Sequence, residues 1–164
     1  SFVHMFNHAL AKGVLFLSVA CLSLRYRDLR IDQLAGAAKA MPFTSAAFLL
    51  GGLSLIGVPG TAGFISKWLL IDALMGQGDH GLLMVAIVLI SSLMAVVYVW
   101  RTVEVLYFKE PVENQSGVVL TEAPALMVGV TLLVALANIL FGLMPELPIR
   151  LAELSADILM GVGQ

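Results

Sequence analysis

Long apolar runs are the feature that most limits what this chain can fold into. Mostly apolar residues cover positions 2–24, 42–58, 61–76, 81–108 and 124–144. A helix that crosses a bilayer needs roughly 20 such residues, and these runs approach or exceed that length. The sequence therefore predicts an all-α fold, a polytopic transmembrane helix bundle of about five spans.

The composition agrees with this prediction. The chain is 60% hydrophobic and 12% charged, whereas a soluble domain is roughly 45–50% apolar and about 25% charged. Spans and short connectors account for most of the 164 residues, so no soluble catalytic domain fits. The formal net charge of -2 leaves no polycationic surface, and nucleic acid is not an expected partner. No glycine-rich phosphate loop or group placed for covalent catalysis is present, so no cofactor and no catalytic site are expected.

The start of the chain does not look like a leader. Residues 2–24 follow Ser1 directly, without a basic segment before them or a small-residue cleavage site after them. We expect residues 1–164 to be the C-terminal part of a longer transmembrane protein.

A cluster of helix-breaking residues separates the second and third apolar runs. The segment VPGTAG covers residues 58–63, and proline and glycine together mark a turn or a helix end. The following run is short for a span, since twelve to fifteen residues cover only about 18–23 Å at 1.5 Å per residue. We therefore expect one discontinuous helix here.

Three ionisable side chains lie on one stripe of the first predicted span. His4, His8 and Lys12 recur every fourth residue, and each such step turns the stripe by only about 40° while rising about 6 Å. The three side chains therefore face the same neighbour. An ionised lysine inside a membrane costs a few kcal/mol and is rarely retained without a partner, a water-filled cavity or a function.

Proton transfer is the first interpretation of this stripe. Imidazole titrates near neutral pH, and a buried lysine can lose its proton under physiological conditions. A zinc-binding membrane protein is a minor alternative, because His4 and His8 have the spacing of the HExxH motif. Asn7 stands where that motif needs its general-base glutamate, so no metal site is assigned.

Lys67 is a second cation inside a predicted span. It follows the breaker segment by four residues, and transporters place ion sites at such discontinuous helices. The alternative is a lysine that extends its ammonium group to the membrane surface. Asp72 lies five residues further on, a poor spacing for an ion pair along a helix.

These motifs resemble a known family. HMFNHALAKGVLFL, RDLRIDQLAGAAKAMP and SLIGVPGTAGFISKWLL follow one another within residues 1 to about 75. In order and spacing they resemble the antiporter-like proton-translocating membrane subunits of complex I, membrane-bound hydrogenases and the multisubunit Mrp sodium/proton antiporters. The lysine in GVPGTAGFISKW makes the likeness greatest to the D-type member of the Mrp group.

The resemblance implies a function and a setting. It implies proton or Na⁺/H⁺ translocation, with His4, His8 and Lys12 as a central relay and Lys67 as the lysine of the discontinuous helix. It also implies other membrane subunits as partners, within a bacterial or archaeal inner membrane. The parent complex stays open among NADH:quinone oxidoreductase, hydrogenase and antiporter. The rival hypothesis is a structural membrane subunit that moves no ions.

Overall fold

The computed structural model describes residues 2–76, 78–110, 121–144, 146 and 150, and this part of the chain is helical without any strand. The elements are α1 (Phe2–Ser23), η1 (Ile31–Leu34), α2 (Ala37–Ala40), α3 (Pro42–Ile56), α4 (Ala62–Met75), α5 (Asp79–Phe108) and α6 (Ala125–Leu143). The expected all-α membrane bundle is thus confirmed.

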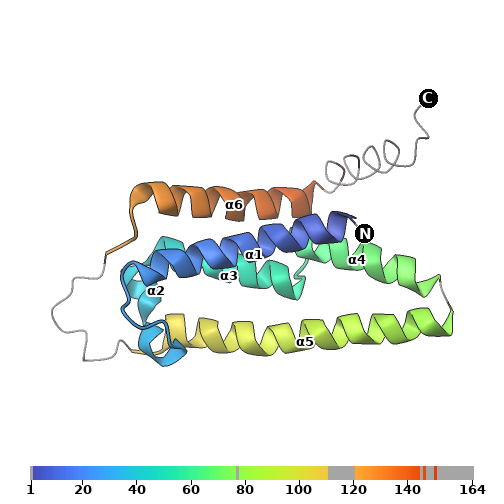
Figure 1. The fold of residues 1–164 in the computed structure, drawn as a ribbon, viewed down its shortest axis with the longest axis horizontal. Helices are drawn as coiled ribbons and strands as arrows, with labels where there is room; N and C mark the ends of the chain where they lie inside the picture. The colour runs from blue at the N-terminus through green and yellow to red at the C-terminus, as the bar shows by residue number, and fades with distance from the viewer. Residues whose placement is uncertain (1, 77, 111–120, 145, 147–149, 151–164) are drawn as a thin grey trace.

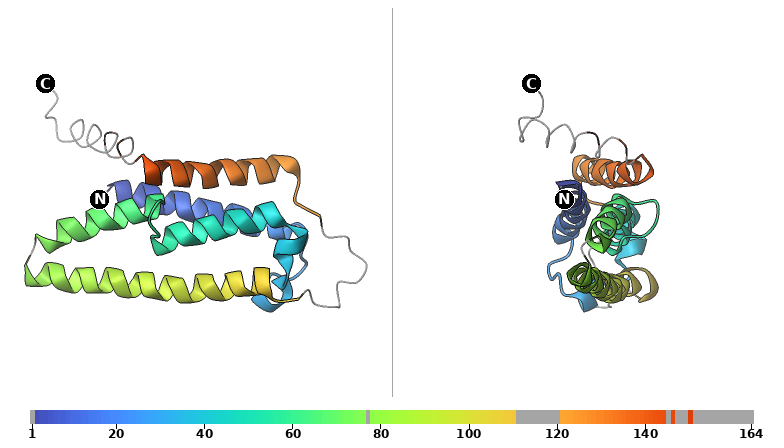
Figure 2. Two further views of the ribbon diagram at one scale, coloured as in Figure 1. Left: turned by 180° about the vertical axis from the view of Figure 1, so that it is seen from behind. Right: turned by 90° about the vertical axis from the view of Figure 1, so that its right-hand side faces the viewer.

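Within the described residues, α1, α5 and α6 are long and apolar enough to cross a membrane, and α3 is a shorter apolar helix. Seen along the bundle in Figure 2, α6 forms one outer layer and α5 the other, with α1 beside α3 and α4 between them. The central position of α1 follows from its contacts, since it packs against α3, α4 and α6.

The predicted break lies between α3 and α4, which follow one another along the length of the bundle (Figure 1). Gly57 ends α3 with a φ of 93°, and its N–H bonds to Leu53 O at 3.0 Å. Glycine adopts this left-handed conformation without steric cost. Pro59 then lacks the N–H needed to continue the helix. With 15 and 14 residues, α3 and α4 are each too short to cross a core of about 30 Å alone.

Small residues let three helices meet at this break. A Cβ atom on Gly63 in α4 would overlap the carbonyl oxygen of Ser54 in α3, and a Cβ atom on Gly142 in α6 would overlap the backbone of Thr61. The Gly63 N–H also donates to Ser54 Oγ at 3.1 Å. Close backbone approach of this kind is typical of packed membrane helices.

The opposite end of α3 is held by a residue far away in the sequence. Glu122, just before α6, accepts hydrogen bonds from Phe43 N at 2.7 Å, Thr44 N at 3.2 Å and Thr44 Oγ1 at 2.8 Å. Its backbone carbonyl accepts a bond from Arg25 at 2.8 Å. Glu122 thus connects the end of α1, the start of α3 and the approach to α6.

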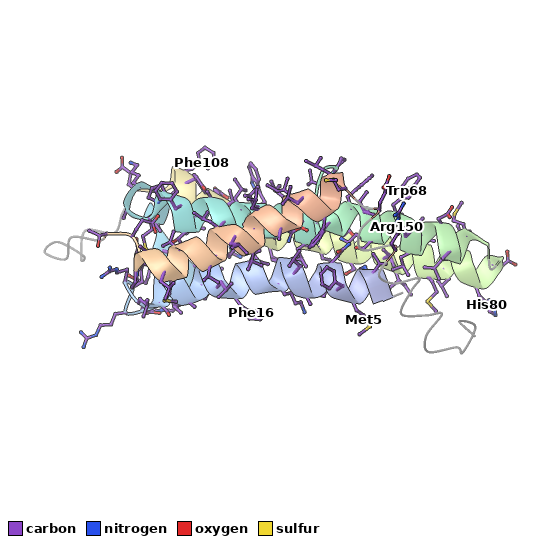
Figure 3. All side chains as sticks on the ribbon, turned by 90° about the horizontal axis from the view of Figure 1, so that it is seen from above. Met5, Phe16, Trp68, His80, Phe108 and Arg150 are labelled. Carbon is purple, nitrogen blue, oxygen red and sulfur yellow. The ribbon has the colours of Figure 1, made fainter. Side chains whose placement is uncertain are left out.

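Large apolar side chains cover the outside of the bundle. Phe16, Trp68 and Phe108 project from the surface in Figure 3 and are 63–74% exposed. A soluble protein would bury such a surface, whereas lipid or neighbouring membrane subunits cover it in a membrane protein.

Candidate functional site

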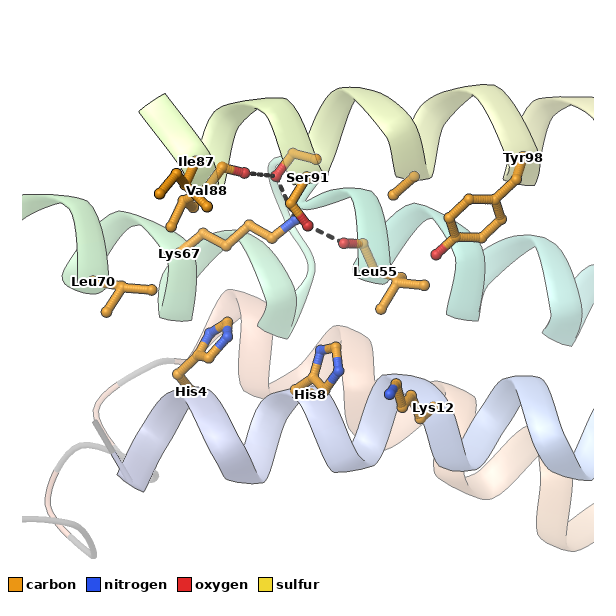
Figure 4. Close-up of a pocket in the computed structure, with 12 residues that line it drawn as sticks. His4, His8, Lys12, Leu55, Lys67, Leu70, Ile87, Val88, Ser91 and Tyr98 are labelled. Carbon is orange, nitrogen blue, oxygen red and sulfur yellow. Dashed lines mark hydrogen bonds between the residues drawn. The ribbon is translucent and has the colours of Figure 1, made fainter. Parts of the chain in front are cut away.

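A cavity of about 400 Å³ lies between α1, α4 and α5, with Leu55 of α3 at its edge. All four residues predicted from the sequence line it: His4, His8 and Lys12 from α1, and Lys67 from α4 (Figure 4). The structure therefore brings together side chains that lie up to 63 positions apart in the sequence.

The stripe on α1 faces this cavity and lies beside a row of buried positions on the same helix. Asn7 and Ala11 are almost fully buried, while His4 and His8 are half-buried beside them. The two imidazole rings are nearly parallel, with centroids 5.8 Å apart and an angle of 25°. Lys12 lies at the exposed end of the row.

Two polar contacts join α1 to the first turns of α4. His4 Nδ1 lies 3.3 Å from Ser66 Oγ, and Asn7 Nδ2 donates to Ala62 O at 2.9 Å. Both contacts fix the position of α1 along the bundle axis, relative to the break between α3 and α4. In the sequence Asn7 only marks the position of a missing catalytic glutamate, and its structural role is visible only in the fold.

Lys67 lies with its ammonium group against the end of α3. Its Nζ donates to Leu55 O at 2.7 Å, to Ile56 O at 2.7 Å and to Ser92 Oγ at 2.8 Å. The last carbonyls of a helix have no partner within the helix, and they carry the negative end of its dipole. The ammonium group therefore turns toward these carbonyls within the bundle.

No carboxylate balances this charge in the part of the chain that is described. The ion pair found there joins Arg30 to Asp28 at 2.8 Å, at an exposed turn away from the cavity. Asp72 is exposed and makes no ion pair with Lys67, as its spacing predicted. Backbone carbonyls and a hydroxyl group thus compensate the charge of Lys67.

Helix α5 contributes residues that sequence analysis missed. Ser92 Oγ accepts the bond from Lys67 and donates its own proton to Val88 O at 3.0 Å. The hydroxyl of Tyr98 points into the cavity at the Lys12 end (Figure 4). Ser91 and Ser92 are a polar pair within a long apolar run. This pair is the feature of the sequence that could have pointed to them. Nothing in that pattern indicates which helix they face.

The geometry also bears on the zinc hypothesis. Among the described residues, no group of three or more His, Cys, Asp and Glu side chains lies close enough to hold a metal ion. A zinc site at His4 and His8 would therefore need ligands from outside this part of the chain.

Comparison with known proteins gives several matches. The family model described as "NADH:quinone oxidoreductase/Mrp antiporter, TM" matches residues 1–95. NADH-quinone oxidoreductase subunit N of Desulforudis audaxviator is 34% identical over 88% of this chain. The alignment spans 30% of that relative's length, so the chain is much shorter than the relative.

Solved structures share the fold. A chain of the membrane-bound sulfane sulfur reductase, an archaeal respiratory membrane complex, matches with a TM-score of 0.76 and 31% identity, over 85% of this chain and 23% of that one. A chain of the Mrp complex from Dietzia sp. matches with a TM-score of 0.78 and 20% identity, over 92% of this chain and 35% of that one. Both come from multisubunit membrane complexes. The greater likeness to the D-type member of the Mrp group stays a prediction.

Proposed function

Because the chain belongs to the NADH:quinone oxidoreductase/Mrp antiporter transmembrane family, we propose that it carries protons through the cavity lined by His4, His8, Lys12 and Lys67. It is an integral membrane protein, and its bacterial and archaeal relatives support an inner-membrane location. In this proposal it acts within a larger complex of membrane subunits, and either protons alone or Na⁺ and protons in exchange cross the membrane.

The main support is the convergence of four titratable groups on one cavity. The stacked rings of His4 and His8 give two successive proton carriers, and Ser66 lies within 3.3 Å of His4. Where no direct contact joins two groups, ordered water can complete a hydrogen-bonded path. A cavity of about 400 Å³ has room for several water molecules, since each occupies roughly 30 Å³ in the liquid.

Charge repulsion would move the proton along this row. Two unit charges 4 Å apart interact by about 4 kcal/mol at an effective dielectric constant of 20, and by less at longer distances. A proton that arrives at Lys12 or a histidine therefore raises the cost of a positive charge on the neighbouring group. If that group is already protonated, it releases its own proton more readily. Lys67, whose ammonium is held by three oxygen atoms, would be the terminal store from which the proton leaves.

The test is pH-gradient formation in vesicles that contain the full-length protein in its complex. Lys67→Ala is compared with wild type at matched assembly, and Lys39→Ala, which changes an exposed lysine outside the cavity, is the control. We expect the gradient to collapse in Lys67→Ala and to persist in Lys39→Ala. A full gradient in the assembled Lys67→Ala complex would favour a structural subunit instead.

One observation favours the second candidate function, a structural subunit that moves no ions. The bonds from Lys67 to Leu55 O and Ile56 O also close the end of α3, which is a purely structural role. Lys67→Arg separates the two functions, because a guanidinium group can donate the same bonds but does not release its proton. A transport role predicts an assembled but inactive Lys67→Arg complex, whereas a structural role predicts normal transport.

A further inference from the structure

Three oxygen atoms converge on one point beside the break in the bundle. They are Leu55 O, Ile56 O and Ser92 Oγ, and the ammonium group of Lys67 lies 2.7, 2.7 and 2.8 Å from them. Two come from the last turn of α3 and the third from α5. A lysine side chain thus places a positive charge within an oxygen cage that is itself neutral.

The chemistry of this cage suits a monovalent cation. Calcium and magnesium sites in proteins are built around carboxylates, and none of the described carboxylates takes part in this cage. The described residues offer it two carbonyls, one hydroxyl and the negative end of the α3 dipole, equivalent to roughly half a charge. Carbonyls at the ends of half-helices coordinate alkali cations in discontinuous transporter helices. An ammonium group and a potassium ion are alike in charge and similar in size.

The space around the cage is shaped by the lysine stem. A Cβ atom on Gly57 would lie 3.0 Å from Lys67 Cδ and 3.5 Å from its Nζ, so the stem fills a slot beside a residue that has no side chain. On its other side lies the cavity of about 400 Å³. Removing the stem would therefore connect the cage to the cavity, where water can supply further ligands.

We infer that Leu55 O, Ile56 O and Ser92 Oγ form a binding site for a potassium-sized alkali cation, which the ammonium group of Lys67 occupies in this structure. Lys67 then acts as a tethered cation. A free ion can enter the site only when the lysine side chain has left the slot. A role of this site in ion exchange rests on the proposed transport function. The binding of a cation does not depend on that function, because it is an equilibrium property of the site.

The test is equilibrium binding of radioactive rubidium, as a potassium probe, to the purified full-length complex in detergent. Lys67→Ala empties the slot and the cage, whereas Lys67→Met removes the charge but keeps a stem of similar length in the slot. We expect Lys67→Ala to bind a rubidium ion at least about tenfold more tightly than Lys67→Met or wild type. Potassium should displace the rubidium, and calcium should not.

A second variant tests whether the oxygen atoms of the cage bind the rubidium ion. Adding Ser92→Ala to Lys67→Ala removes one of three oxygen ligands, and we expect the affinity to fall by about tenfold, the effect of losing one charge-assisted contact. Equal binding by Lys67→Ala and Lys67→Met, or binding that ignores Ser92→Ala, would overturn the inference. If Lys67→Ala does not assemble, Lys67→Asn also leaves the slot open and carries the same expectation.

The two proposals can fail separately. Rubidium binding is measured without a membrane or a gradient, so loss of transport in Lys67→Ala does not affect its outcome. Conversely, a cage that binds no rubidium would leave the proton path through His4 and His8 untouched.

Discussion

Lys67 illustrates how backbone carbonyls and a hydroxyl group can hold a cation inside an apolar bundle. An ionised lysine at the centre of a membrane helix costs about 2.5–3.5 kcal/mol on insertion scales. Each hydrogen bond to a charged group contributes about 1.5–3 kcal/mol, and Lys67 makes three. Two carbonyls at the end of α3 and the hydroxyl of Ser92 are therefore enough to offset the cost, and the break between α3 and α4 leaves those carbonyls free to accept.

Asn7 is the residue that ties the histidine stripe to the break. It is fully buried and donates to Ala62 O at 2.9 Å. We expect Asn7→Ala to lower the stability of the full-length protein by about 1–3 kcal/mol, since it removes this bond and leaves a void. Thermal unfolding in detergent measures the change. Met5→Ala, on the exposed side of α1, is the matched control, and an equal effect of both changes would contradict the proposed role of Asn7.

At the scale of elements, α3 is held at both ends by charges from other segments. The carboxylate of Glu122 accepts bonds from its first N–H groups, and the ammonium of Lys67 donates to its last carbonyls. Each charge has the sign that complements the helix dipole at that end. Because α3 contains no charged residue of its own, both charges must come from the tertiary fold.

Glu122→Ala tests the first of these contacts. We expect a loss of about 1–2 kcal/mol in stability, as for the removal of a helix N-cap. Glu122→Gln should cost less, because an amide oxygen still accepts the bonds although it carries no charge. Thermal unfolding of the full-length protein gives the comparison, and Glu104→Ala on the exposed side of α5 is the control. If Glu122→Ala and Glu104→Ala lowered the stability equally, the bonds from Glu122 to the start of α3 would not stabilise the protein.

Two glycines test the close packing at the break. Gly63→Ala would drive a methyl group into the carbonyl of Ser54, so we expect a loss of at least about 1–3 kcal/mol from overpacking. Gly129 in α6 has open space around it, and alanine there should raise stability by about 0.5–1 kcal/mol because it favours the helix. The difference in unfolding midpoint between the two variants is the measurement. A similar midpoint for both would mean that α3 and α4 can separate without cost.

At the scale of the whole molecule, the outer face of α5 is apolar along much of its length. Leu82 and Leu93 are 65% and 67% exposed, near the start and the middle of a helix of 30 residues. Such a face is stable only against lipid or another membrane subunit. Among the described residues, large apolar side chains thus cover the outside of the bundle, around an interior that is mostly apolar and also holds buried polar groups such as Asn7 and Asn138.

Lysine substitutions along this face test the membrane position. Leu93→Lys should cost about 3 kcal/mol, the penalty for a charge at the centre of a span. Leu82→Lys should cost less, because a lysine near a helix end can extend its ammonium group to the membrane surface. The yield of membrane-assembled protein measures both, with Leu93→Ala as the control for lost packing. Equal yields for the two lysine variants would place α5 outside the hydrocarbon core.

Much of the fold and of the candidate site could be predicted from the sequence, for identifiable reasons. Apolar runs predicted the helices, the VPGTAG segment predicted the break, and the cost of burying charge selected His4, His8, Lys12 and Lys67. These signals are local, because a helical period or a proline acts on its own neighbours in the chain. The contacts of Ser66 and Ser92 were not predicted, since a small hydroxyl residue is common in membrane helices and gives no direction.

The sequence alone determined that this chain forms apolar helices, where they break, and which ionisable groups lie within the apolar runs. The tertiary structure alone decided that Lys67 meets the carbonyls of α3 and Ser92, and that Glu122 reaches the other end of that helix. The physical reason is the range of the interactions. Helix formation and its termination depend on nearby residues, whereas the partners of a buried charge depend on which helices pack together.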